Sequence, residues 1–117
     1  MTPKSAKAKG RNLQNWVRNQ FIKLGFLPGD VKTAIMGEPG ADVKFSPAVE
    51  KAVPYHIECK SRQKFAIYTI YKKAQESIKG EKPILLVIKQ NKERPLVVVD
   101  AEDFFEIYES QLTSMGY

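Results

Sequence analysis

The chain has 117 residues, of which 43% are hydrophobic and 27% are charged, proportions typical of one soluble globular domain. Its single cysteine excludes an internal disulfide, and the absence of a Cys/His cluster from the sequence disfavours a zinc site. No apolar run approaches the length of a membrane-spanning helix, and no secretory signal pattern is present. We therefore expect a cytoplasmic protein with no membrane partner.

The net charge of +6 is unevenly distributed along the chain. Six of the 19 basic residues lie in residues 1–29, which contain no Asp or Glu, and the other 13 balance the 13 acidic residues. A polyanion such as nucleic acid is a natural partner for this basic segment, because neutralising phosphates releases condensed counterions. A solvated, solubilising surface is the alternative interpretation of the charge alone.

The apolar pattern predicts an α/β fold with a mixed sheet flanked by helices, in the order helix, strand, strand, strand, helix, strand, strand, helix. Residues 1–9 are basic without apolar periodicity, so we expect a flexible arm there and a single domain at residues 10–117. The first helix runs from about Arg11 to Gly25. Its apolar stripe favours a core position for Trp16, with base stacking as the alternative.

The remaining elements follow from alternation, apolar runs and turn residues. Short strands are predicted at residues 31–35, 42–46 and 55–60, with a helical turn in the loop 47–54. A second helix should end near Gly80, with Lys72 and Lys73 on a solvated face or, alternatively, on DNA. The continuous apolar run 84–88 predicts a buried strand with an antiparallel partner at 96–99. Asp100 should cap the last helix.

Glu58 and Lys60 lie in the predicted strand at 55–60. Because side chains alternate along a strand, Glu58, Lys60 and His56 share one face, while Cys59 points to the core. If the strand containing Asp42 pairs with this one, Asp42 and Glu58 can share a divalent cation such as Mg2+, which prefers oxygen ligands. The alternative is a surface ion pair between Glu58 and Lys60. For His56 we favour a packing or substrate-side role over that of a base.

Asp42 followed by Glu58-Cys59-Lys60 resembles the metal-binding core of the PD-(D/E)XK nuclease superfamily. The helix order, the turn 37–40 and the basic Lys9-Gly10-Arg11 opening are similar to the small archaeal and phage Holliday-junction-resolvase-like endonucleases. The resemblance spans about residues 9–100 and implies a restriction-endonuclease-like core. Two positions depart from the family pattern. Ala41 replaces the proline, and Gln14 stands where these members usually carry a glutamate, a carboxylate that Glu38 could supply instead.

The resemblance implies a metal-dependent endonuclease that cleaves branched DNA as a homodimer, with Mg2+ as cofactor and Mn2+ able to substitute. Asp42, Glu58 and the backbone carbonyl of Cys59 would hold the metal. Lys60 would orient the attacking water and stabilise phosphate charge, and Gln75 would contact phosphate or water. For a phage-encoded member, the cytoplasm in question would be that of the host. Expected DNA contacts are Lys4, Lys7, Lys9, Arg11, Arg62 and Lys64. The expected dimer interface is Phe104, Phe105 and Tyr108, or the loop after Phe45.

Two other functions are compatible with the sequence. One is a non-catalytic nucleic-acid-binding module, which the neutral Gln14 favours. The other is a nuclease of the same superfamily that acts on flap, single-stranded or damaged DNA, or on RNA. Cleavage assays on these substrates separate the three possibilities.

Overall fold

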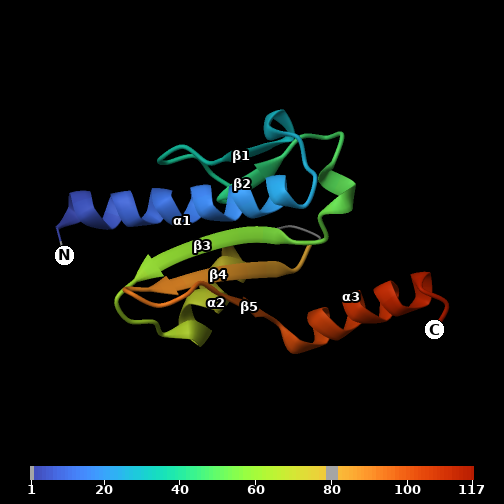
Figure 1. Ribbon diagram of the computed structural model, residues 1–117. Coiled ribbons are helices and arrows are strands. Elements are labelled where there is room, and N and C mark those ends of the chain that lie inside the picture. Colours follow the sequence, from blue (N-terminus) through green and yellow to red (C-terminus); the bar gives the residue numbers. More distant parts are fainter. Residues whose placement is uncertain (1, 79–81) are drawn as a thin grey trace.

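A five-stranded mixed sheet forms the centre of the computed structural model, which describes residues 2–78 and 82–117 (Figure 1). Its strands lie in the order β1-β2-β3-β4-β5, with β3 and β4 parallel and the other neighbours antiparallel. The strands are β1 (Val31–Thr33), β2 (Val43–Phe45), β3 (His56–Arg62), β4 (Ile84–Gln90) and β5 (Leu96–Val99). The helices are α1 (Pro3–Lys23), α2 (Ile67–Ser77) and α3 (Ala101–Ser114). The predicted single α/β domain with a mixed sheet and flanking helices is confirmed at this level.

Helix α1 packs on one face of the sheet (Figure 1). Leu13 and Val17, one helical turn apart, are buried against Ile57 and other apolar residues of the strands, together with the Cys59 side chain. Trp16 does not belong to this core, and 44% of it remains exposed. The predicted core position for Trp16 is therefore wrong. The face formed by Leu13 and Val17 meets the sheet, which leaves Trp16 at the flank of the helix.

The N-terminal segment also differs from the prediction. Residues 3–9, which precede the predicted helix start at about Arg11, form the first turns of α1. The side chain of Thr2 caps the helix by accepting a hydrogen bond from the Ser5 amide at 3.1 Å, and Pro3 occupies the first helical turn. A threonine cap followed by proline is a favourable helix start, and Ala6 and Ala8 have the highest helix propensity.

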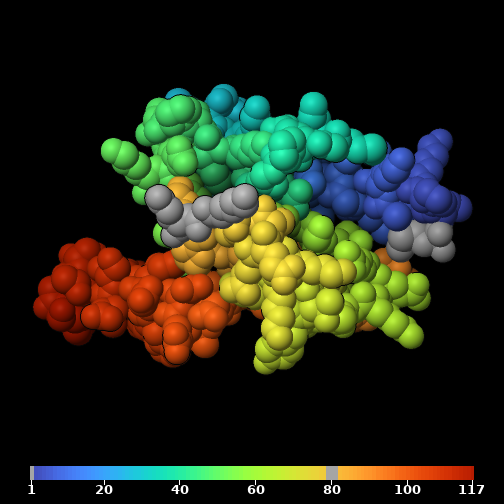
Figure 2. Space-filling model, turned by 180° about the vertical axis from the view of Figure 1, so that it is seen from behind, coloured from blue at the N-terminus to red at the C-terminus, as the bar shows by residue number. Residues whose placement is uncertain are grey.

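Helix α2 covers the opposite face of the sheet, as the view from behind shows (Figure 2). Ile70, Tyr71 and Ala74 pack there on Leu86 and its neighbours in β4. Strand β4 is buried on both faces, because Val87 belongs to the core under α1. The prediction for the apolar run 84–88 and for its antiparallel partner is thus confirmed. The predicted end of α2 near residue 80 lies outside the described residues.

Three smaller features complete the fold. The 3-10 turns are η1 (Pro28–Asp30) and η2 (Glu50–Ala52), and η2 confirms the helical turn predicted in the loop 47–54. Asp100 caps α3 as predicted, since its carboxylate accepts a hydrogen bond from the Asp103 amide. Helix α3 contains no buried residue and projects from the sheet (Figures 1 and 2). Within the described part of the chain, no helix combines the length and apolar character that crossing a membrane would require.

Candidate active site

Strand pairing brings Asp42 and Glu58 together. Val43 of β2 is the register partner of Ile57 in β3, and the Asp42 amide donates a hydrogen bond to the Ile57 carbonyl at 2.9 Å. Continuing this antiparallel register by one residue places Asp42 opposite Glu58. Val43 and Ile57 both point into the core under α1, so side-chain alternation directs Glu58 to the α2 face of the sheet. Asp42 directly precedes β2, and its side chain lines a cavity beside α1.

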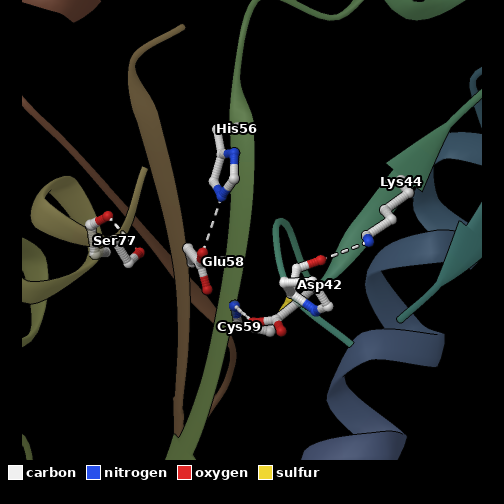
Figure 3. Close-up of polar contacts among 8 residues, drawn as sticks. Asp42, Lys44, His56, Glu58, Cys59 and Ser77 are labelled. Atoms are coloured by element: carbon white, nitrogen blue, oxygen red, sulfur yellow. Dashed lines mark hydrogen bonds and ion pairs between the residues drawn. The ribbon is translucent and has the colours of Figure 1, made fainter. Parts of the chain in front are cut away.

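The environment of Asp42 reflects this proximity (Figure 3). Its Oδ2 accepts a hydrogen bond from the Cys59 amide at 2.8 Å, which ties the β2 end to β3. Burial raises the pKa of Asp42 to about 6, and the nearby Glu58 carboxyl adds to the increase. The Cys59 amide and the Lys60 ammonium group oppose it. A carboxylate whose proton affinity is raised by a neighbouring carboxylate can be neutralised by one divalent cation that both share.

Glu58 is held by His56, a contact that the sequence did not predict. The His56 Nε2 atom lies 2.9 Å from Glu58 Oε1, and the two side chains are only 17% and 11% exposed (Figure 3). The sequence feature that could have predicted this contact is the spacing of two residues on one strand, because residues so spaced share a face. A partly buried carboxylate that is oriented by an imidazole has a fixed geometry, as metal ligands typically do.

A cavity of about 310 Å3 lies between β3 and α2. Glu58, Lys60 and Arg62 line it from the strand, as expected for alternate residues of one face. Helix α2 contributes a hydroxyl and cationic face to the same cavity, made by Thr69, Lys73 and Ser77. This arrangement surrounds one carboxylate with three cationic side chains, which suits an anionic group such as a phosphodiester.

Gln75 does not reach this cavity. It is exposed on α2 and is absent from the cavity lining, where Thr69, Lys73 and Ser77 follow each other at four-residue intervals. Gln75 follows Lys73 by two residues, which places it on a different face of the helix. Lys73 therefore lines the same cavity as Glu58, whereas the predicted Gln75 does not. Lys64, a predicted DNA contact, is exposed just beyond the strand.

Asp42 lines a second cavity, of about 530 Å3, between α1 and the β1–β2 connection. Lys7, Arg11 and Gln14 line it from α1, so two of the predicted DNA contacts and the position without a carboxylate lie near Asp42. Lys4 is exposed one turn earlier on α1. The cationic side chains of Lys7 and Arg11 thus share a cavity with Asp42, a carboxylate of the candidate metal site.

Glu38 lines the same cavity but is already engaged. Its Oε1 accepts a hydrogen bond from the Ile35 amide at 3.1 Å, and its Oε2 pairs with the Lys44 ammonium group. The hydrogen bond from Lys44 lowers the pKa of Glu38. This pairing disfavours Glu38 as the third carboxylate ligand that the sequence suggested. Among residues 2–78 and 82–117, no group of three or more His, Cys, Asp or Glu side chains could hold a metal ion.

The carboxylates that the structure brings together here are those of Asp42 and Glu58. Oxygen donors of this kind fit Mg2+, which keeps several waters and needs only one or two protein carboxylates. The Cys59 thiol is buried in the core, and burial raises its pKa. A neutral, buried thiol is neither a nucleophile nor a metal ligand.

The comparisons with known proteins leave the family open. The chain matches no protein-family model, no curated protein sequence and no solved structure. The interpretation of the site accordingly depends on its own geometry and chemistry.

Proposed function

We propose that the protein is a metal-dependent endonuclease that hydrolyses DNA phosphodiester bonds. The observation that carries the proposal is the placement of Asp42 opposite Glu58 with Lys60 on the same face of β3. Paired carboxylates with a neighbouring lysine suit phosphate hydrolysis, because they join a cation site to a charge that stabilises the phosphate. We infer a restriction-endonuclease-like core from the same arrangement together with the element order.

In this proposal each side chain has a separate task. Asp42, Glu58 and the Cys59 carbonyl would hold Mg2+ or Mn2+, and the bound ion would activate water and neutralise phosphate charge. Lys60 would orient the attacking water and contact the scissile phosphate. His56 would keep Glu58 in place through the 2.9 Å contact.

The DNA is expected to contact cations on both sides of the site. Arg62 and Lys73 border the Glu58 cavity, and Lys7 and Arg11 border the cavity at Asp42. We propose branched DNA as substrate and a homodimer as the active form, because a junction offers two equivalent scissile strands to a twofold assembly. The exposed aromatic residues Phe104, Phe105 and Tyr108 of α3 are candidates for the dimer interface.

A non-catalytic nucleic-acid-binding module is the second candidate. The neutral Gln14 and the pairing of Glu38 with Lys44 favour it, because they leave only two carboxylates for a metal. A nuclease that acts on flap, single-stranded or damaged DNA is the third. These candidates differ in whether cleavage occurs and in which substrate is cut.

The test is cleavage of a labelled four-way junction, a flap, a duplex and a single strand across a Mg2+ titration. Junction cleavage should exceed that of the other substrates, and Asp42→Asn and Glu58→Gln should abolish it while DNA binding in Ca2+ persists. Glu106→Gln is the matched control, because Glu106 is exposed on α3. Wild-type protein that binds DNA without cutting it would support the binding module. Cleavage by either carboxylate variant at the wild-type rate would overturn the assignment of the site.

A further inference from the structure

A third cavity, of about 520 Å3, lies on the opposite side of the sheet from Glu58. Helix α1 contributes Lys9, Asn12 and Trp16 to it, and β3 and β4 contribute Ser61 and Lys89, which are register partners. Figure 1 shows the N-terminal half of α1 beside the C-terminal ends of these two strands. We refer to this space as the Trp16 cavity.

Trp16 gives the cavity an accessible aromatic wall. Trp16 is 44% exposed, and Leu13 and Val17 fill the adjacent core in its place. Pro95 adds a further apolar group to the lining. An accessible indole that borders a cavity offers a flat surface on which a planar ligand can stack.

The charged part of the lining is cationic, beside the neutral polar residues Asn12, Ser61 and Asn91. Lys9, Lys89 and Lys92 line the cavity, and its lining contains no Asp or Glu. Among the described residues, no carboxylate forms an ion pair with any of these three lysines. Lys9 donates one hydrogen bond to Asn91 Oδ1 at 2.9 Å, which leaves two of its ammonium hydrogens for a ligand. The ligand that fits is planar and negatively charged.

We propose that the Trp16 cavity binds an unpaired nucleotide within a single-stranded stretch of nucleic acid. The base would stack on Trp16, and the lysines would neutralise the flanking phosphates, a combination typical of single-strand binding. A paired base cannot do this, because its faces are covered by its neighbours in the duplex. The choice of nucleic acid as partner rests on the proposed function, and the inference adds the substrate class, DNA with an unpaired segment.

The position of the cavity is consistent with this role. Ser61 directly follows Lys60 in β3, and the two residues line cavities on opposite faces of the strand. Arg62 follows at the strand end and lines the Glu58 cavity. A nucleic acid strand that passes this end of β3 can therefore contact both cavities. Its unpaired part would lie on Trp16 while its phosphodiester lies near Lys60.

The chain offers a direct reporter for this interaction, because Trp16 is its only tryptophan. Titrating the protein with oligothymidylate in Ca2+ should quench the tryptophan emission as the base stacks on the indole. An abasic oligonucleotide of equal length is the matched control, since it keeps the phosphates but has no base. It should bind without quenching. Unchanged emission at saturating oligothymidylate would overturn the proposal, as would equal quenching by free thymidine nucleotide at the same concentration.

Substitutions provide the second measurement. Stacking energies of single bases on aromatic residues predict that Trp16→Ala weakens oligothymidylate binding roughly fivefold to a hundredfold. Trp16→Phe should lose less, because it retains an aromatic face. Tyr117→Ala, which removes an aromatic side chain that is 86% exposed at the C-terminus, should bind as the wild type does. The far-ultraviolet circular dichroism of each variant verifies folding. Wild-type affinity in Trp16→Ala would overturn the proposal.

These measurements separate the inference from the proposed nuclease activity. If the protein cuts DNA but shows neither quenching nor an effect of Trp16→Ala, the nuclease proposal is supported and the stacking proposal is wrong. If the protein shows both effects but cuts no DNA, the stacking proposal is supported, and the protein is a binding module and not a nuclease. Binding in Ca2+ or without divalent ions keeps the two experiments independent.

Discussion

His56 Nε2 lies 2.9 Å from Glu58 Oε1, so the only histidine of the chain contacts the buried carboxylate of the candidate site. The contact depends on the backbone of the strand that carries both residues. Strand β3 places both side chains on one face, and the small exposed fractions of the two side chains limit the competition of water for the contact. The pair thus links the local strand geometry to the orientation of a candidate metal ligand.

This contact leads to a prediction for His56→Ala. Without the imidazole, Glu58 can rotate away from Asp42, and the apparent Mg2+ affinity or the cleavage rate should fall about 10- to 100-fold, as is typical when the partner of a metal ligand is removed. His56→Gln can still donate a hydrogen bond to Glu58 and should recover part of the loss. The measurement is the cleavage rate across a Mg2+ titration. Equal rates for wild type and His56→Ala at every Mg2+ concentration would show that the contact has no positioning role.

The raised pKa of Asp42 predicts a pH dependence of stability. In the fold its pKa is about 6, against an ordinary value of 3.8, so the folded state binds more protons than the unfolded state between these values. The free energy of unfolding should therefore decrease as pH rises from about 4 to about 6, and remain lower above. Allowing for solvent screening, the expected loss is about 1–2 kcal/mol.

Asp42→Asn should remove this loss, because the amide is neutral at every pH and keeps an oxygen for the Cys59 amide. Urea unfolding at pH 4 and pH 8, without divalent ions, measures the difference. The variant should exceed the wild type in stability at pH 8 but not at pH 4. Mg2+ should stabilise the wild type more at pH 8 than at pH 5, since binding requires the deprotonated carboxylate. Equal Mg2+ stabilisation at both pH values would contradict a role for Asp42 as ligand.

Particular residues show how far the sequence determines this site. The two-residue alternation of β3 was sufficient to predict that Glu58 and Lys60 share a face, and both line the cavity beside α2. Asp42 lies just before β2, where alternation does not apply, and it lines the cavity beside α1. The phase of α2 was not predictable in the same way. Its stripe of Ile70, Tyr71 and Ala74 fixes the buried face, but the two flanks of that face are equivalent in sequence. Only packing decides that Lys73, rather than Gln75, lies beside Glu58.

Trp16 illustrates a second limit of sequence patterns. An apolar stripe that is wider than the contact surface leaves some of its members at the edge, and the sequence does not say which. In α1 the sheet accommodates Leu13 and Val17, and the largest residue of the stripe stays partly exposed. The helix start at Pro3, in contrast, was present in the sequence as the Thr2 cap and Pro3.

Neighbouring lysines on α2 allow a matched comparison. Lys73 lines the Glu58 cavity, whereas the exposed Lys72 and Gln75 do not. Lys73→Ala should weaken DNA binding. The slope of log affinity against log salt concentration should decrease in magnitude by about one unit, the effect of one lost phosphate contact. Lys72→Ala and Gln75→Ala should leave affinity and slope unchanged. A larger effect of Gln75→Ala than of Lys73→Ala would restore the role that the sequence suggested for Gln75.

The lysines at the start of α1 should contribute to DNA binding without determining the fold. Replacing Lys4, Lys7 and Lys9 together by glutamine removes three charges while keeping residues of good helix propensity. The slope of log affinity against log salt should decrease in magnitude by about two to three units. Lys23→Gln, an exposed change in the last turn of α1, is the control. A slope that equals that of the wild type would show that this end of α1 does not contact phosphates.

Lys60→Ala should separate metal binding from catalysis. Lys60 provides no ligand oxygen, so Asp42 and Glu58 should still hold Mg2+, and relief of charge repulsion should if anything strengthen the binding. Loss of the ammonium group removes a stabiliser of the developing phosphate charge, which costs about 100- to 1000-fold in rate. DNA affinity should change much less, because Arg62 and Lys73 remain beside Glu58.

Single-turnover cleavage across a Mg2+ titration, with binding measured in Ca2+, tests the Lys60 prediction. Lys60→Arg is the informative partner variant, because it keeps the charge but changes the shape and hydrogen-bond geometry of the donor. It should bind DNA as the wild type does and recover only part of the rate. If Lys60→Ala cleaved normally at saturating Mg2+, the Glu58 and Lys60 face of β3 would be an ordinary strand surface. The proposed nuclease mechanism would then be wrong, because it depends on Lys60. Lys60 follows Glu58 by two residues on the same face of β3, whereas Arg62 is two residues further along the strand.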